Sequence, residues 1–231
     1  MVQVNPTKLV LRFKFKKLGS LQYISHLDLA RTMYKVIVRA KLPLWYTEGF
    51  NPKPKMVFAA PLSIGTESMT EFMDLRLSEH IDPAEAMARL NANMTEEMQA
   101  LDCYYPDSKF TELKWMSYRI TVKTSNLSDE LVESCNEALA AEKIEVLKST
   151  KSGENIVDIR PLIKSAEAVR SGESVVISAT LCADPSAFLN PEYVVRFLRE
   201  KCGILSSPNL LEEHYEIMRL SAYFEDMREF R

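Results

Sequence analysis

The sequence has few of the features on which catalysis or membrane insertion usually depends. Its 231 residues include four cysteines, Cys103, Cys135, Cys182 and Cys202, and no two of them form a C-x-x-C pair. Zinc ribbons, thioredoxin-like redox sites and local iron–sulfur motifs are therefore unsupported, and buried free thiols are expected. No Walker or G-x-G-x-x-G pattern occurs, and no carboxylate or histidine cluster indicates a metal. We therefore expect neither a cofactor nor a metal.

Long apolar runs are also missing. None approaches the roughly 18 residues that a membrane span needs, so no membrane partner is expected. The first residues contain no apolar signal core followed by a small-residue cleavage site. They are interpreted as mature sequence, which makes the cytoplasm the expected location.

Glycine is scarce, because the chain contains only six, yet two of them lie in the stretch YTEGFNPKPKMVFAAPLSIGTES at 46–68. Gly49 gives the backbone freedom where a side chain would clash, and Pro52 and Pro54 stiffen the path. Lys53 and Lys55 have the same parity, so an extended segment would project both side chains to one side.

Acidic residues are rare in the first 55 positions, which contain two acids against eleven Lys and Arg, a net charge of +9. Because the whole chain has a net charge of −3, the remainder has −12. This polarity indicates a positive surface that faces an anion, with nucleic acid the main candidate. The alternative is that these cations only keep one end of the molecule hydrated. The eleven basic residues are Lys8, Arg12, Lys14, Lys16, Lys17, Arg31, Lys35, Arg39, Lys41, Lys53 and Lys55.

Residues 9–19 alternate apolar and basic side chains, which predicts a half-buried strand. Residues 25–43 change to helical spacing, with Ser25 as the cap, Asp28 three positions on and Pro43 at the end. Further strands are expected at 44–49, 55–62, 70–77, 116–124, 143–150 and 215–226, with helices at 82–106, 127–142 and 190–203. Residues 154–163 and 173–181 are interpreted as a hairpin pair.

This order predicts an α+β fold of two tandem ferredoxin-like (split βαβ) units with antiparallel sheets. A basic unit would span 1–115 and an acidic unit 116–231, with the join near 112–125. The strand at 116–124 could close the first unit or open the second.

Residues 23–77 resemble the radical SAM-linked protein family, a bacterial domain of unknown function found alone or attached to radical SAM proteins. The matching elements are Ser25-His26-Leu27-Asp28, Arg39-Ala40, Gly49-Phe50-Asn51-Pro52, Pro61-Leu62 with Gly65, and Glu71 followed by Asp74. This chain has Lys53 where the family pattern has histidine. The resemblance implies a radical SAM enzyme as partner, acting on RNA or a ribosome-related substrate. It does not make this chain the radical enzyme, which needs closely spaced cysteines.

The expected binding site combines the helix with the Gly/Pro loop. Arg31, Lys35 and Arg39 recur at i, i+4 and i+8, so they form one row of cations on the helix. Beside that row the loop would complete an anion-binding cradle, in which an exposed aromatic residue stacks on a base. The residues expected to bind are Arg31, Lys35, Arg39, Tyr46, Gly49, Phe50, Asn51, Lys53 and Lys55. The alternative is a purely structural loop with hydrated lysines.

Three functions remain open from the sequence. The first is a non-catalytic module that binds RNA or presents an anionic substrate to a radical SAM enzyme. The second is a metal-independent RNA-processing nuclease of the tandem ferredoxin-like type, in which His26 with Lys53 or Lys55 would act on the 2′-hydroxyl. His26 is a weak candidate, because Asp28 two positions away on a helix does not face it. The third is a protein-interaction scaffold whose acidic half docks the partner enzyme.

Overall fold

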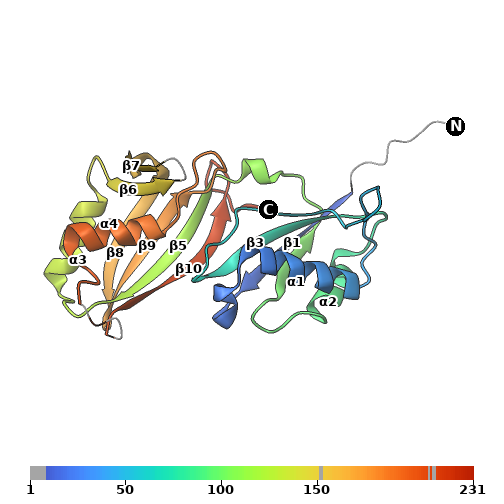
Figure 1. Ribbon diagram of the computed structural model, residues 1–231, viewed down its shortest axis with the longest axis horizontal. Helices are drawn as coiled ribbons and strands as arrows, with labels where there is room; N and C mark the ends of the chain where they lie inside the picture. The colour runs from blue at the N-terminus through green and yellow to red at the C-terminus, as the bar shows by residue number, and fades with distance from the viewer. Residues whose placement is uncertain (1–8, 151–152, 208, 210–211) are drawn as a thin grey trace. The chain divides into compact units, whose positions relative to one another are not determined.

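The computed structural model describes residues 9–150, 153–207, 209 and 212–231 and divides into two compact units (Figure 1). Unit 1 extends to Phe110 and includes Arg231, and unit 2 comprises Thr111–Phe230. The described residues form four α-helices and antiparallel strands, so the fold is mixed α+β, as the sequence predicts. None of the described helices is both long and apolar enough to cross a membrane.

Unit 1 is built from strands β1, β2, β3 and β4, helices α1 and α2, and the short 3-10 helix η1. In chain order they are β1 (Val10–Lys17), η1 (Gly19–Tyr23), α1 (His26–Arg39), β2 (Met56–Phe58), β3 (Thr66–Arg76), α2 (Pro83–Asn91) and β4 (Ala100–Tyr104). The strands lie in the order β4-β1-β3, with β2 paired to β3, and every pair is antiparallel.

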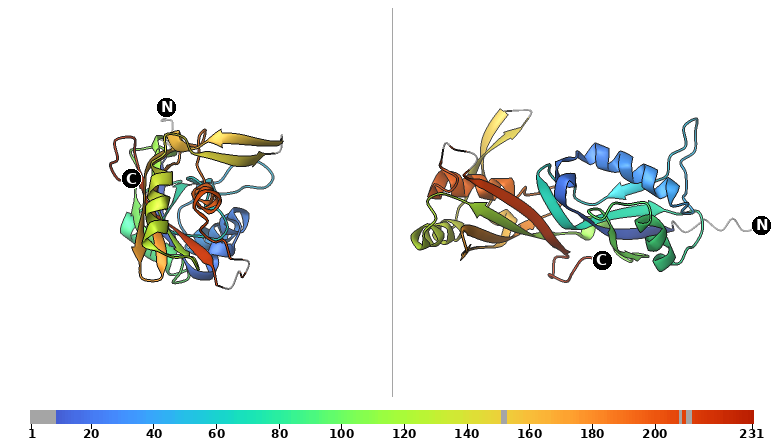
Figure 2. Two further views of the ribbon diagram at one scale, coloured as in Figure 1. Left: turned by 90° about the vertical axis from the view of Figure 1, so that its left-hand side faces the viewer. Right: turned by 90° about the horizontal axis from the view of Figure 1, so that it is seen from below.

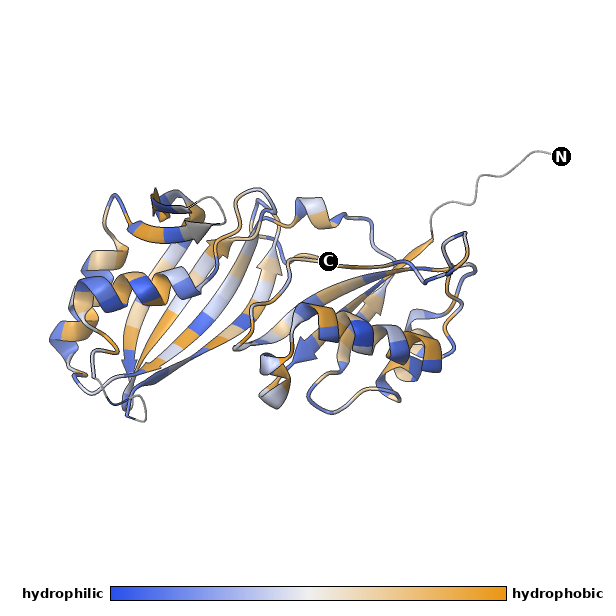
Figure 3. Ribbon diagram, viewed as in Figure 1, coloured by the Kyte–Doolittle hydropathy of each residue, from blue (hydrophilic) through white to orange (hydrophobic). Residues whose placement is uncertain are grey.

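The core of unit 1 follows from its two periodicities. Leu11, Phe13 and Phe15 alternate along β1 and are fully buried. Met33 and Ile37 of α1 are also fully buried, because they repeat at helical spacing on one side. Figure 3 shows the resulting apolar and polar stripes along α1. Both helices contribute to the same buried cluster, so they cover the same face of the sheet (Figure 1).

Unit 2 has two helices, a four-stranded sheet and a separate hairpin. Its elements are β5 (Trp115–Lys123), α3 (Asp129–Leu139), β6 (Glu145–Thr150), β7 (Gly153–Asp158), η3 (Arg160–Leu162), β8 (Ile163–Ser171), β9 (Ser174–Cys182), α4 (Glu192–Cys202) and β10 (His214–Tyr223). The sheet order is β10-β5-β9-β8, and all pairs are antiparallel. The β6–β7 hairpin stands out from this sheet (Figure 2).

The two units share one strand order. In unit 1 the strands lie across the sheet in the order β4-β1-β3-β2, which is fourth, first, third and second along the chain. In unit 2 the order β10-β5-β9-β8 is also fourth, first, third and second, if the strands of the β6–β7 hairpin are not counted. β5 pairs with β9 and β10, so the strand predicted at 116–124 opens unit 2 rather than closing unit 1.

Several predicted elements are confirmed. Residues 9–19, 70–77 and 116–124 contain strands β1, β3 and β5, and residues 25–43 contain α1. The Ser25 side chain accepts a hydrogen bond from the backbone N–H of Asp28, as the capping pattern predicts. Gly203 ends α4 in the left-handed conformation, with φ of +77°.

The helix predicted over 82–106 is wrong beyond residue 91. α2 ends at Asn91, and residues 100–104 form β4 instead. The Asn91 side chain donates to the Ala100 carbonyl and accepts from the Ala100 N–H, so it holds the start of the strand against the end of the helix. Pairing of β4 with β1 then overrides the helical spacing of the methionines and leucines.

The hairpin predicted between 154–163 and 173–181 is also wrong. β7 pairs back to β6, and β9 pairs instead with β8, which the sequence prediction missed. β8 is a sheet edge with mostly exposed side chains, so it lacks the apolar alternation that reveals a strand. The strand expected at 55–62 is shorter in the structure, where β2 covers only Met56–Phe58. The strand expected at 44–49 is reduced to isolated bridges at Leu44 and Tyr46.

Candidate functional site

Helix α1 carries the first part of the candidate site. Its hydrogen-bonded cap at Ser25 fixes where the helix begins, and therefore which side chains share a face. Arg31 and Lys35 lie one turn apart on the exposed side, next to Ala30 and Tyr34. Lys35 forms no ion pair with any described residue, which leaves its ammonium group available to a ligand.

The segment between α1 and β2 folds back on itself as a short two-stranded ribbon. Tyr46 and Pro54 pair across it, and the backbone N–H of Lys55 donates to the carbonyl of Trp45 at 3.3 Å. Thr47 closes the tip twice, because its N–H donates to the Lys53 carbonyl at 2.9 Å and its hydroxyl accepts from the Lys53 N–H at 3.1 Å. These bonds fix the position of Lys53.

The tip requires its glycine. Gly49 has φ of +120°, a conformation that side chains rarely allow, although no atom lies within 4 Å of the position a Cβ would occupy. Glycine is therefore needed at position 49 because of the backbone conformation and not because a side chain would clash with a neighbour. Phe50 follows it and is fully exposed at 112%, an unusual environment for a phenylalanine.

The helix and the ribbon meet around one open hollow of about 530 Å³. We call it the basic hollow, and its lining residues are Ala30, Arg31, Tyr34, Lys35, Lys53, Pro54 and Met56. Three of these residues are cationic and none is acidic. Outside the lining, Asp28 forms an ion pair with Arg31 at 3.4 Å, and both side chains are more than half exposed. Such an exposed pair contributes only ~0–1 kcal/mol, so it competes weakly with a bound anion.

The structure brings together only part of the predicted site. Arg31, Lys35 and Lys53 line the basic hollow, whereas Arg39 is exposed on α1 but does not line it. Tyr46, Gly49, Phe50 and Asn51 are exposed on the ribbon and its tip, also outside the hollow.

Lys53 and Lys55 line different hollows. Their spacing of two residues predicts instead that both side chains project from the same side of an extended segment. Lys55 lines a second hollow of about 190 Å³ with Val10, Val57, Asp74 and Arg76. The backbone explains the separation, because Lys55 is already held against β3, where its carbonyl accepts from the Arg76 N–H at 3.0 Å. Two-stranded ribbons also twist strongly, so alternate residues diverge.

His26 does not form a dyad with Asp28. Its ring contacts Phe58 edge to face, with centroids 5.3 Å apart. Asp28 instead accepts from the Ser25 hydroxyl at 2.7 Å and contacts Arg31. His26 lines neither the basic hollow, where Lys53 lies, nor the hollow where Lys55 lies, so neither hollow combines it with a lysine as the nuclease hypothesis expects.

Two of the eleven basic residues in the first 55 positions do not lie on the surface. Arg12 and Lys17 of β1 are buried, at 0% and 1% exposure, whereas the strand pattern places Arg12 on a solvent face. Arg12 is covered because Asp74, Ser108 and Phe110 contact its guanidinium. Lys8 lies outside the described residues. The net positive charge available at the surface is therefore smaller than the sequence count suggests.

The sequence did not single out Tyr34 and Met56 as lining residues. Tyr34 follows the helical spacing of the core, and Met56 belongs to an apolar strand, so both patterns predict burial. Their partly exposed surfaces add aromatic and apolar lining to the hollow beside the three cations. Among the described residues, no group of three or more His, Cys, Asp or Glu could hold a metal ion.

Comparison with known proteins gives a family and little more. Curated proteins provide no match to the chain. Among solved structures, the chain is similar to one from "Crystal Structure of a Cbf5-Nop10-Gar1 Complex", at 10% identity and a TM-score of 0.49, covering 91% of this chain and 49% of that one. A chain from "Crystal structure of the archaeal box H/ACA sRNP Nop10-Cbf5 complex" has 8% identity and a TM-score of 0.45, with 90% and 46% covered.

The chain thus spans about half the length of these two solved chains. A third, "Crystal Structure of an Unknown Protein from Galdieria sulphuraria", has 10% identity, 92% and 99% coverage and a TM-score of 0.26. These likenesses are too distant to carry a functional argument. A family model matches residues 10–191, most of the chain, and the protein therefore belongs to the bacterial family described as "Uncharacterized protein conserved in bacteria (DUF2344)".

Proposed function

We propose that this protein binds RNA, or another anionic substrate, through the basic hollow of unit 1. The observation that carries the proposal is the convergence of Arg31, Lys35 and Lys53 on one hollow whose lining includes no carboxylate. Phosphate groups are bound by Lys and Arg side chains in such an arrangement, because each contact neutralises a backbone charge and releases counterions.

The lining of the hollow favours RNA over a simple inorganic anion. The partly exposed Tyr34 and Met56 offer aromatic and apolar surface beside the cations. Single-stranded nucleic acid is bound by this combination, with phosphates on basic groups and bases on aromatic faces. Phe50, fully exposed at the ribbon tip, provides a second stacking surface.

We also propose that the chain is an accessory protein of a radical SAM enzyme, and that its two units are ferredoxin-like. The first proposal rests on the motif resemblance at residues 23–77. The second is supported by the β-α-β-β-α-β order and by the strand order common to both units, with the β6–β7 hairpin inserted in unit 2. In this view unit 1 binds the substrate and the enzyme performs the chemistry.

Fluorescence anisotropy of labelled tRNA and ribosomal RNA fragments across a salt series tests the binding. Log–log plots of affinity against salt should have a slope of about −0.7 per phosphate contacted for single strands, hence about −2 for the three cations of the hollow. Absence of binding at low salt would contradict the proposal. Binding without salt dependence would contradict the phosphate contacts.

A further inference from the structure

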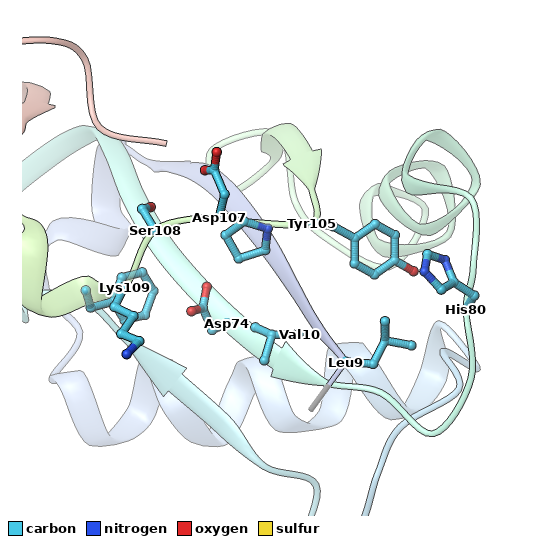
Figure 4. Close-up of a pocket in the computed structure, with 10 residues that line it drawn as sticks. Leu9, Val10, Asp74, His80, Tyr105, Asp107, Ser108 and Lys109 are labelled. Atoms are coloured by element: carbon cyan, nitrogen blue, oxygen red, sulfur yellow. The ribbon is translucent and has the colours of Figure 1, made fainter. Parts of the chain in front are cut away.

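A pocket of about 600 Å³ lies on the opposite face of the unit 1 sheet from the helices (Figure 4). We call it the sheet-face pocket, and it is lined by Leu9, Val10, Asp74, His80, Tyr105, Pro106, Asp107, Ser108, Lys109 and Phe110. Val10 and Asp74 face this side because their neighbours Leu11 and Leu75 belong to the core beneath the helices. Its volume suits a small-molecule ligand.

The floor of the pocket is a fixed carboxylate. Arg12 holds Asp74 at both oxygens, through Nε at 2.7 Å and Nη2 at 2.9 Å. The guanidinium also donates to the Ser108 hydroxyl and carbonyl and lies 4.3 Å from the Phe110 ring centroid. Arg12 is fully buried, but the Asp74 side chain remains 18% exposed. Asp74 therefore offers a rigid hydrogen-bond acceptor to a ligand.

The other end of the pocket is aromatic. The His80 and Tyr105 rings lie together, with centroids 4.3 Å apart, as Figure 4 shows. The Tyr105 hydroxyl accepts from the Ile81 N–H at 3.0 Å and donates to the Ile81 carbonyl at 2.9 Å, which fixes its ring. With Leu9 and Val10 these rings form apolar surfaces against which a planar ring can pack.

The surroundings are positively charged. Val10 and Asp74 also line the smaller second hollow, where Lys55 and Arg76 lie, so the two hollows adjoin at these residues. The cations around Asp74 are Arg12, Lys55, Arg76 and Lys109, whereas the other acid that lines the two hollows is Asp107. A ligand that fits this environment carries a hydrogen-bond donor for Asp74 on a planar ring and negative charge elsewhere.

We propose that the sheet-face pocket binds an adenine nucleotide, either free or as one residue of an RNA strand. The ring packs against Leu9, Val10 and the aromatic pair, the 6-amino group donates to Asp74, and the phosphate lies toward Lys55 and Arg76. Adenine fits better than guanine because Arg12 already occupies both Asp74 oxygens, which favours one donor group over guanine's adjacent pair. This site is separate from the basic hollow and does not depend on it.

Isothermal titration of the full chain with AMP and with IMP tests the proposal without altering the protein. IMP has an oxygen in place of the 6-amino group, which would face the Asp74 carboxylate unpaired. AMP should bind saturably and IMP at least about tenfold more weakly, because sites built to pair a polar group discriminate strongly against its loss. Equal affinity for the two nucleotides, or no saturable AMP binding at millimolar concentration, overturns the proposal.

Two variants separate this site from the basic hollow. His80→Ala removes an exposed ring and should weaken AMP binding about fivefold, which is the loss expected for one stacking surface. Lys35→Glu, which alters only the basic hollow, should leave AMP affinity unchanged. The reverse pattern would place AMP in the basic hollow and overturn the assignment.

The same comparison in a short oligonucleotide identifies the source of the ligand. Replacement of one adenosine by inosine should weaken binding if the pocket takes a residue of a strand. If the pocket takes only the free nucleotide, AMP should bind more tightly than IMP, and replacement of adenosine by inosine in the oligonucleotide should not change its affinity. Absence of the preference for AMP over IMP contradicts the proposal whatever the oligonucleotide shows.

Discussion

Unit 1 and unit 2 have the same order of helices and strands, apart from the β6–β7 hairpin, yet they use their charged residues differently. In unit 1, Lys35 and Lys53 face an open hollow without an ion-pair partner among the described residues. In unit 2, the buried Glu213 is enclosed by donors from Thr124, Ser125 and Ser207. Equal topology therefore accommodates an open cationic hollow in one unit and a structural network in the other, because side chains rather than strand order decide what a unit can do.

Net charge alone does not express this difference. Residues 1–110 contain fourteen Lys and Arg against twelve Asp and Glu, a net +2, and residues 111–231 contain fifteen against twenty, a net −5. What distinguishes unit 1 is that its exposed cations converge, while Arg12 is buried with Asp74. Variants can separate the charges that stabilise each unit from the charges that remain available to a ligand.

The largest effect is expected from the buried pair of unit 1. Asp74→Ala leaves the Arg12 guanidinium buried without its carboxylate, and loss of one partner of such a pair costs ~3–5 kcal/mol of unfolding free energy. Urea denaturation followed by circular dichroism measures the loss. The double variant Arg12→Met with Asp74→Leu should recover most of it, because no unpaired charge remains. A double variant as unstable as Asp74→Ala would refute this explanation.

Glu213 in unit 2 should give the next largest effect, and it should depend on pH. Burial on its own would raise the pKa of Glu213, but hydrogen bonds from Ser125, Ser207 and Thr124 outweigh it and lower the pKa to about 2. Because the pKa falls below its ordinary value of 4.5 on folding, the ionised group stabilises the fold above pH 4.5, and this stability is lost as the pH falls toward 2.

Glu213→Gln should therefore cost ~2 kcal/mol near neutral pH, since charged acceptors form stronger hydrogen bonds than neutral ones. The difference between the variant and the wild type should shrink between pH 4.5 and pH 2. Thermal unfolding across this range measures it. A difference that stays constant with pH would show that the carboxylate charge is not responsible.

The helix caps allow a matched comparison of the two units. Ser25 caps α1 and Ser128 caps α3, the equivalent helix, and each side chain accepts a backbone N–H at 3.1 Å. Replacement of either serine by alanine should cost ~1 kcal/mol of unfolding free energy. Only Ser25→Ala should weaken RNA binding, because α1 carries Arg31 and Lys35. Weaker binding in both variants would mean that the effect follows stability rather than the site.

Phe50→Ala should have the smallest effect on stability. The side chain is fully exposed, so unfolding free energy should change by less than ~0.5 kcal/mol. RNA affinity should nevertheless fall about fivefold if Phe50 stacks on a base, since stacking contributes ~1 kcal/mol or more. Unchanged affinity would restrict the binding surface to the hollow itself.

The sequence predicted the elements that depend on local signals and missed those that depend on pairing. The capped helix α1 and the alternating strand β1 follow directly from spacing. β4 and β8 could not be predicted this way, because one follows a methionine-rich helical pattern and the other is a polar sheet edge. Their identity depends on partners distant in the chain.

The candidate site shows the same limit. Arg31 and Lys35 are one turn apart, so their shared face was predictable, and the Gly/Pro loop indicated that Lys53 lies nearby. The sequence did not predict that Lys55 lines a different hollow from Lys53, because the position of Lys55 depends on hydrogen bonding of the ribbon to β3. The burial of Arg12 depends on residues 74, 108 and 110, which no local pattern connects to it.

The central claim is tested most directly by the salt dependence of RNA binding in two charge-reversal variants of one helix. Lys35 lines the basic hollow, and Arg39, one turn further along α1, does not. Lys35→Glu should weaken binding about tenfold, as expected for loss of one charge-assisted contact, and should lower the salt slope by about one phosphate contact. Arg39→Glu should change affinity by less than about twofold, since it lies outside the hollow. Equal losses in the two variants would contradict the account, because they would mean that general positive charge, rather than the hollow, attracts the RNA.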